Sequence, residues 1–228
     1  MESVLVLTHA DESGSALTRS SLEAVTAGQQ LAARLGAQLT IGIVTPHLGP
    51  AADELASAGA RLLAVSGEAF AQPRYASCSA AAEALCRAAQ PTIVLASAAS
   101  AFSRCLAGVS HRLGGVIDTH ITALSASGPL EITRWFYRQR IEGVLSRDAR
   151  PWFVLLEAGV HPVFDGARGA AAVEQVSVQL PLLRTTVIGI ETPAHDAQTC
   201  WRRTTATPAA AERRSLQWPA CSTRTSSS

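Results

Sequence analysis

Apolar residues come in short blocks separated by polar turns from the start of the chain. The run Val4 to Thr8 is rich in valine and leucine, as in strands buried within a parallel sheet. Apolar or small residues then recur every three or four positions from Leu17 to Leu35, which predicts one buried stripe of an α-helix. Ser15 is expected to cap this helix and Gly36 to end it. Residues 38–44 predict a second strand, parallel to the first and beside it.

The same alternation continues to about residue 115. It predicts helices over residues 51–58, 77–89 and 101–113, and strands over residues 61–65 and 91–97. Gly114 and Gly115 follow the last helix, where glycines commonly form a C-cap and a turn. Strands that alternate with helices in this way are typical of an α/β fold, so we expect a mostly parallel sheet with helices on both faces.

From His120 onward the strand candidates follow one another with only turns between them. They cover residues 120–126, 130–138, 143–147 and 152–159, and they predict antiparallel strands that extend the sheet. Two further candidates are residues 173–180 and 185–191. Beyond them the chain is rich in Pro, Thr, Ser and Arg, with too little apolar surface to offset its ordering entropy. This predicts one domain over residues 1–190 and a linker with a disordered tail over residues 191–228.

Charge and composition exclude several classes of partner. The formal net charge is only +1, so electrostatics favour neither nucleic acid nor an anionic membrane surface. The sequence shows neither an export signal nor an apolar run of the roughly 20 residues that a membrane span needs. The expectation is a soluble, cytoplasmic protein without membrane insertion. Its five cysteines lack a CxxC pair, which indicates reduced thiols rather than a disulfide framework or a zinc site.

Residue types for catalysis are present, but their positions argue against it. Cys105, His111 and Asp118 would supply a nucleophilic triad. However, Cys105 lies inside a predicted helix and not at a strand-to-helix elbow, which favours a buried, inert thiol. His111, Asp118 and His120 do not have the spacing of a common zinc site. We therefore predict no catalytic and no metal-binding residues.

Phosphate-binding loops are also missing from the sequence. No G-x-G-x-x-G or P-loop pattern follows a predicted strand. Ser97, Ser100 and Ser103 lie where the fourth strand meets its helix, so backbone N–H groups there could meet an anion. Capping of the helix by Ser100 is the favoured alternative. No cofactor-binding residue is predicted.

Basic and aromatic residues gather on the added strands. The basic ones are Arg134, Arg138, Arg140, Arg147 and Arg150. Strand alternation predicts that Arg134, Phe136 and Arg138 share one face, while Trp135 and Tyr137 share the other. Such a stripe suits either contact with a partner protein or a solvated edge that resists sheet-to-sheet aggregation. Acidic residues nearby favour these two readings over nucleotide binding, and residues 134–138 are the partner-contact candidates.

The order of these pieces resembles one family, the alpha subunits of electron-transfer flavoproteins. Residues 15–44 are similar to the family's first helix and second strand. Residues 91–124 resemble its strand, Ala-rich turn and following helix, and the matching positions are Phe102, Arg104, Arg112, Leu113 and Asp118. Residues 132–159 resemble the R-P-x-Y-x-G-N-A strand pair, with Arg134 and Tyr137 in the matching places.

The chain departs from the family's pattern in two ways. Trp135 replaces the usual Pro, and residues 138–140 (Arg-Gln-Arg) replace the small A-G-N turn. The glycine-rich S-G-G-R-G-like loop and the later segments that cradle FAD in the family are not found in this sequence. A shifted reading frame or a natural short form would each account for this ending, and sequencing the encoding DNA would distinguish them.

The resemblance implies an electron carrier, not a catalyst. Complete family members pair with a beta subunit, hold FAD and carry electrons from dehydrogenases to a quinone reductase. We therefore expect this chain to supply the amino-terminal domain that packs on the beta subunit, and to bind no FAD alone. The alternative is a stand-alone α/β domain that binds or hydrolyses adenine nucleotides, because this architecture hosts many functions.

Overall fold

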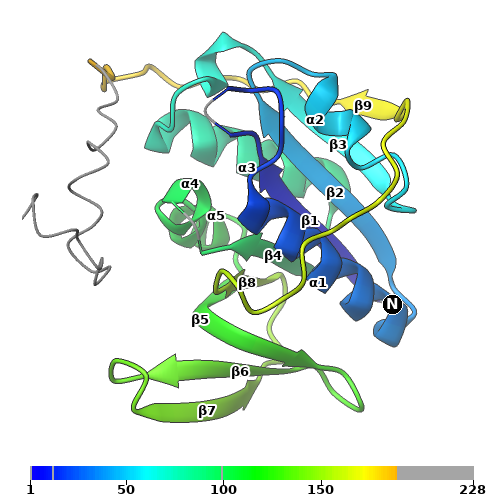
Figure 1. Ribbon diagram of the computed structural model, residues 1–228. Helices are drawn as coiled ribbons and strands as arrows, with labels where there is room; N and C mark the ends of the chain where they lie inside the picture. The colour runs from blue at the N-terminus through cyan, green and yellow to red at the C-terminus, as the bar shows by residue number, and fades with distance from the viewer. Residues whose placement is uncertain (1, 12, 99, 189–228) are drawn as a thin grey trace, which may run out of the picture. The chain divides into compact units, whose positions relative to one another are not determined.

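The predicted strands assemble into one mixed sheet. The computed structural model describes residues 2–11, 13–98 and 100–188, and the predicted tail from residue 191 lies outside them. The strands run in the order β7-β6-β5-β8-β4-β1-β2-β3-β9 (Figure 1). They are β1 (Ser3–His9), β2 (Gln38–Thr45), β3 (Arg61–Ser66), β4 (Ile93–Ser97), β5 (Val116–Ser125), β6 (Glu131–Phe136), β7 (Ile141–Ser146), β8 (Trp152–Leu156) and β9 (Val173–Gln175).

The helices connect the parallel strands and cover both faces of the sheet. They are α1 (Arg19–Leu35), α2 (Pro50–Asp53), the 3-10 turn η1 (Glu68–Phe70), α3 (Tyr75–Ala89), α4 (Ser100–Ser103) and α5 (Leu106–Arg112). Apolar residues of α1 and α2 pack in one core cluster, and those of α3, α4 and α5 pack in the other. The predicted α/β fold with helices on both faces and added antiparallel strands is confirmed.

The β1–α1–β2 unit follows its sequence pattern closely. β1 and β2 are parallel neighbours, as predicted, with Val6 opposite Ile41. Gly36 ends α1 in the left-handed conformation, at φ 57°. The prediction of the cap was wrong, since Thr18 and not Ser15 accepts the N–H of Ser21. The reason is tertiary: Leu17 is buried in a bridge to Ala10 and donates its N–H to Glu54, so the helix starts only after it.

Two predicted helices are shorter than their apolar stripes suggested. The helix expected over residues 51–58 is regular only in α2 and continues as turns, because no side chain caps its start and short helices nucleate at a cost. The helix expected over residues 101–113 is broken between α4 and α5. Phe102 and Cys105 at this break are both fully buried and belong to the same core cluster.

The largest correction concerns β8. The sequence suggested an antiparallel strand, but β8 pairs in parallel with both β4 and β5. All five of its residues are buried. A strand buried on both faces is a continuous apolar run, whereas the hairpin strands β6 and β7 mix apolar and polar residues. The antiparallel prediction holds for the β5–β6 and β6–β7 pairs.

Residues 157–172 form a strap that leads from β8 to the opposite edge of the sheet. The strap lies against α1, where Glu23 accepts the N–H of Gly159 and the carbonyl of Leu22 accepts that of Phe164 (yellow in Figure 1). β9 then pairs in parallel with β3. The strand expected over residues 173–180 is thus limited to β9. Residues 185–188 form no strand, and residues 189–191 lie outside the described part.

Close packing of α1 on β1 makes Gly28 sensitive to added volume. A Cβ at this position would collide with Val6. We expect Gly28→Val to lower the free energy of unfolding by roughly 1–3 kcal/mol, because overpacking forces backbone or rotamer shifts. Ala33→Val adds the same kind of side chain on the exposed side of α1 and serves as the control. Urea unfolding checks this, and equal midpoints for the two variants would contradict the packing argument.

Candidate partner-binding surface

The antiparallel extension is built from three strands. β5 is parallel to β8 over its first half and antiparallel to β6 over its second half. Between the two lies an irregular stretch in which His120 has φ 60°, and its Nδ1 lies 2.6 Å from Oε1 of Glu157. β7 is an edge strand of the sheet. The β6–β7 hairpin therefore presents both a free edge and a turn (Figure 1).

Cross-strand pairing assigns the hairpin residues to faces. Arg134 is opposite Ile121 on one side and Gly143 on the other, so these residues share a face. Phe136 is on this face too, and the Arg134 guanidinium lies 4.6 Å from its ring centre. Trp135 is on the other face, as predicted. The predicted alternation fails beyond that point, because β6 ends at Phe136 and Tyr137 and Arg138 lie in the turn.

The turn has an unusual backbone for its sequence. Tyr137, Arg138 and Gln139 have φ 48°, 56° and 66°. Residues with a Cβ pay roughly 1–2 kcal/mol each for this left-handed conformation, which glycine adopts freely. The side chain of Tyr137 is 76% exposed. The turn thus presents large side chains where small ones would fit its backbone better.

A buried carboxylate holds the base of the hairpin. Asp118 on β5 is 1% exposed. Its Oδ1 accepts hydrogen bonds from Nη1 of Arg134 at 3.1 Å and from Nη2 of Arg147 at 2.8 Å. Its Oδ2 accepts hydrogen bonds from Nε of Arg147 and, at 2.9 Å, from Nε1 of Trp152. These partners come from β6, from the end of β7 and from β8. One carboxylate therefore links every strand around the hairpin base.

The surroundings of Asp118 keep it ionised. Burial alone would raise its pKa, but hydrogen bonds from Arg147 and Trp152, with the charges of Arg147 and Arg134, lower the pKa below its ordinary value. The same contacts raise the pKa of Arg147. The cluster is consequently a charged one at neutral pH.

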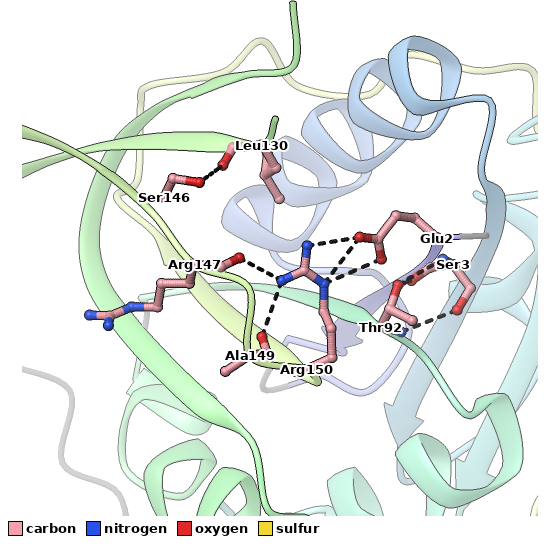
Figure 2. A network of polar contacts seen from close by, with 8 residues as sticks. All are labelled: Glu2, Ser3, Thr92, Leu130, Ser146, Arg147, Ala149 and Arg150. Atoms are coloured by element: carbon pink, nitrogen blue, oxygen red, sulfur yellow. Dashed lines mark hydrogen bonds and ion pairs between the residues drawn. The ribbon is translucent and has the colours of Figure 1, made fainter. Parts of the chain in front are cut away.

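A second guanidinium fastens the connection between β7 and β8. Figure 2 shows the contact between Arg150 and Glu2, in which Nη2 of Arg150 lies 2.8 Å from Oε1 of Glu2. Arg150 also donates hydrogen bonds to the carbonyls of Arg147 and Ala149. The hydrogen bond from Arg150 lowers the pKa of Glu2. In the same view Ser146 at the end of β7 donates to the carbonyl of Leu130. The hairpin base is therefore tied to the sheet at two separate points.

Comparison with known proteins assigns this chain to a family. A family model described as the electron transfer flavoprotein domain matches residues 6–181. The chain belongs to this family. The matched range runs from β1 past β9 and so includes the whole hairpin. A comparison with curated proteins found no match.

The positions that carried the resemblance to electron-transfer flavoprotein subunits occupy distinct places. Asp118 and Arg134 meet in the buried cluster. Phe102 is buried next to His9, with ring centres 5.5 Å apart. Nε of Arg112 lies 2.6 Å from Glu83, and Arg104 is exposed. Of these positions, Asp118 and Arg134 meet at the hairpin base, and Tyr137 lies in the hairpin turn.

Other candidates from the sequence do not form a site. Cys105 packs in the core cluster on the α3 side of the sheet, and burial raises the pKa of its thiol to about 12. Asp118 instead accepts a hydrogen bond from Trp152, which belongs to the core cluster on the α1 side. The triad is therefore not assembled, and the expected buried thiol is confirmed. Across residues 2–11, 13–98 and 100–188, no group of three or more His, Cys, Asp or Glu residues could hold a metal ion. α4, which begins at Ser100, has four residues, too few for an anion site at a helix start.

Sequence reasoning missed the central position of Asp118. It noted Arg134, Arg147 and Arg150 as one stripe, but in the structure each has a specific carboxylate partner. An aspartate within an apolar strand was the available signal, since buried acids need paired cations.

Within the described residues, no helix is both long and apolar enough to cross a membrane.

Proposed function

We propose that this chain acts as an alpha-type subunit of an electron-transfer flavoprotein and that the described domain packs on a beta subunit. The match to the electron transfer flavoprotein domain over residues 6–181 carries the proposal. The alpha-type assignment rests on the ordered series that includes Phe102, Asp118 and Arg134. In this role the chain supports electron transfer between proteins and performs no catalysis itself.

The hairpin offers the surface for such a partner. We define the hairpin surface as Trp135 and Val144, which share one face of the hairpin, Tyr137 and Arg138 in the turn, and Ile141, which is on the opposite face at the sheet edge. Ile141 and Val144 on the edge strand are 52% and 61% exposed, and Trp135 is half-buried. Aromatic and arginine side chains are enriched at the centres of protein interfaces, and long apolar edges are usually covered. These features support a partner at the hairpin and favour it over a solvated edge.

The described residues do not fit the diphosphate of FAD. A dinucleotide bound in the Rossmann manner needs a glycine-rich turn with free N–H groups after the first strand of the sheet. The turn after β1 instead carries Asp11, whose carboxylate accepts the N–H of Ser13 at 3.1 Å and its hydroxyl at 2.6 Å. A Cβ at Gly14, the glycine of this turn, would collide with Pro46. We infer that this chain alone binds no FAD.

Reconstitution tests the proposed function. The purified chain is mixed with the electron-transfer flavoprotein beta subunit of the same organism and analysed by size exclusion and calorimetry. We expect a one-to-one complex, and no visible flavin absorbance from the chain alone. Failure to form a complex would overturn the alpha-type role. Micromolar binding of AMP or ATP by the isolated chain, without a beta subunit, would support the nucleotide-binding alternative instead.

A further inference from the structure

We propose that the hairpin turn, residues 137–140, docks on an acidic patch of the partner protein and that Arg138 and Arg140 recognise its carboxylates. This inference rests on the proposed function, because the partner it names is the beta subunit. It goes further by assigning the chemistry of the contact to particular side chains of this chain.

The two guanidinium groups at the turn differ from the other arginines of the hairpin region. Arg134 and Arg147 bind Asp118, and Arg150 binds Glu2. Arg138 and Arg140 are exposed, and within the described residues neither takes part in an ion pair. The turn thus carries positive charge that nothing else in the described domain neutralises.

The left-handed backbone of the turn lowers the stability of the fold, so these residues do not serve stability alone. Tyr137, Arg138 and Gln139 each adopt a left-handed conformation that glycine or asparagine would hold at lower cost. Residues held in such conformations cluster at binding elements, where the strain positions a side chain. Tyr137 and Ile141 place exposed apolar surface beside the guanidinium groups, a combination that suits a protein contact.

A protein surface suits this turn better than a nucleic acid does. Affinity for a duplex comes largely from neutralising many phosphates, and the turn offers only two cations that are unpaired within the described residues. A protein patch can place two carboxylates opposite these two arginines. The Glu142 carboxylate accepts the hydroxyl of Thr122 at 3.5 Å, so it faces β5 and leaves the turn positive.

The first experiment compares two charge reversals of equal size. Arg138→Glu with Arg140→Glu changes the turn, and Arg104→Glu with Arg184→Glu changes exposed arginines outside the hairpin by the same charge. Association with the beta subunit is followed by stopped flow at low and high salt. We expect the turn variant to associate about tenfold more slowly at low salt and to lose most of the salt dependence. Equal rates for both variants would overturn the proposal.

The second experiment separates charge from backbone strain. Arg138→Gly and Gln139→Gly both relieve a left-handed residue, so each should raise the melting temperature by about 2–4 °C. Only Arg138→Gly removes a guanidinium, and only this variant should weaken binding to the beta subunit. Equal binding by the two variants would contradict recognition by charge.

Two controls distinguish a failure of the proposed function from a failure of the docking inference. If the wild-type chain forms no complex with the beta subunit, the proposed function is wrong. If it forms the complex and charge reversal has no effect, only the docking inference is wrong. A short DNA duplex is tested as a competing polyanion at physiological salt. Binding of the duplex by wild type, with loss in the turn variant, would overturn the protein-patch assignment in favour of nucleic acid.

Discussion

Asp118→Ala is expected to lower the free energy of unfolding by about 3–5 kcal/mol. Removing one partner of a buried ion cluster leaves the other charges without compensation. Here the loss would strand the guanidinium groups of Arg134 and Arg147 and leave the indole N–H of Trp152 without its acceptor. Urea unfolding followed by circular dichroism measures the change.

A matched control is the pair of Arg61 and Glu174 at the opposite edge of the sheet. Both side chains are largely exposed, and Nη2 and Oε2 are 2.7 Å apart. Glu174→Gln should cost less than about 1 kcal/mol, because exposed pairs contribute little. Similar losses in the two variants would show that Asp118 has no special role at the hairpin base.

The pH dependence of stability follows from the lowered pKa of Asp118. The unfolded state titrates near the ordinary value of 3.8, and the folded state titrates below it. The unfolded chain therefore binds more protons at acidic pH. The stabilisation from this group is complete above the unfolded pKa and is lost as pH falls through the lowered folded pKa. Asp118→Asn should thus be less sensitive to acid below about pH 4 than wild type, and identical acid profiles would contradict this assignment.

Trp135→Ala combined with Tyr137→Ala is expected to weaken association with the beta subunit by roughly 2–4 kcal/mol. This corresponds to roughly a 30- to 1,000-fold increase in Kd. The two residues are candidates because Trp135 lies on the face of β6 opposite Asp118, and Tyr137 lies in the exposed turn. Calorimetric titration with the beta subunit measures the effect.

The fold should survive this double substitution. An aromatic fully packed in a core costs roughly 3–5 kcal/mol when truncated, whereas Trp135 is half-buried and Tyr137 is exposed. The melting temperature should therefore change little. Tyr75→Ala on α3 is the control, because it truncates another exposed aromatic away from the hairpin. A collapse of the melt would show that Trp135 packs inward, and unchanged binding with an unchanged melt would remove these residues from the interface.

Local patterns in the sequence were sufficient for the β1–α1–β2 unit and its neighbours. Strand and helix periodicities depend on which residues lie a few positions apart, and so does the left-handed end of α1 at Gly36. The same local logic placed Trp135 and Phe136 on opposite faces of β6. It failed where the backbone left the strand, because alternation holds only as far as the extended conformation does.

Only the tertiary structure decided the position of β8 and the role of Asp118. β8 pairs with strands from distant parts of the chain, and its place between β4 and β5 depends on which apolar runs can be covered on both faces. Asp118 meets Arg134, Arg147 and Trp152 across 16, 29 and 34 residues of sequence. The partners of a buried charge are selected in space, since a desolvated carboxylate must be compensated by whichever cations the fold brings to it.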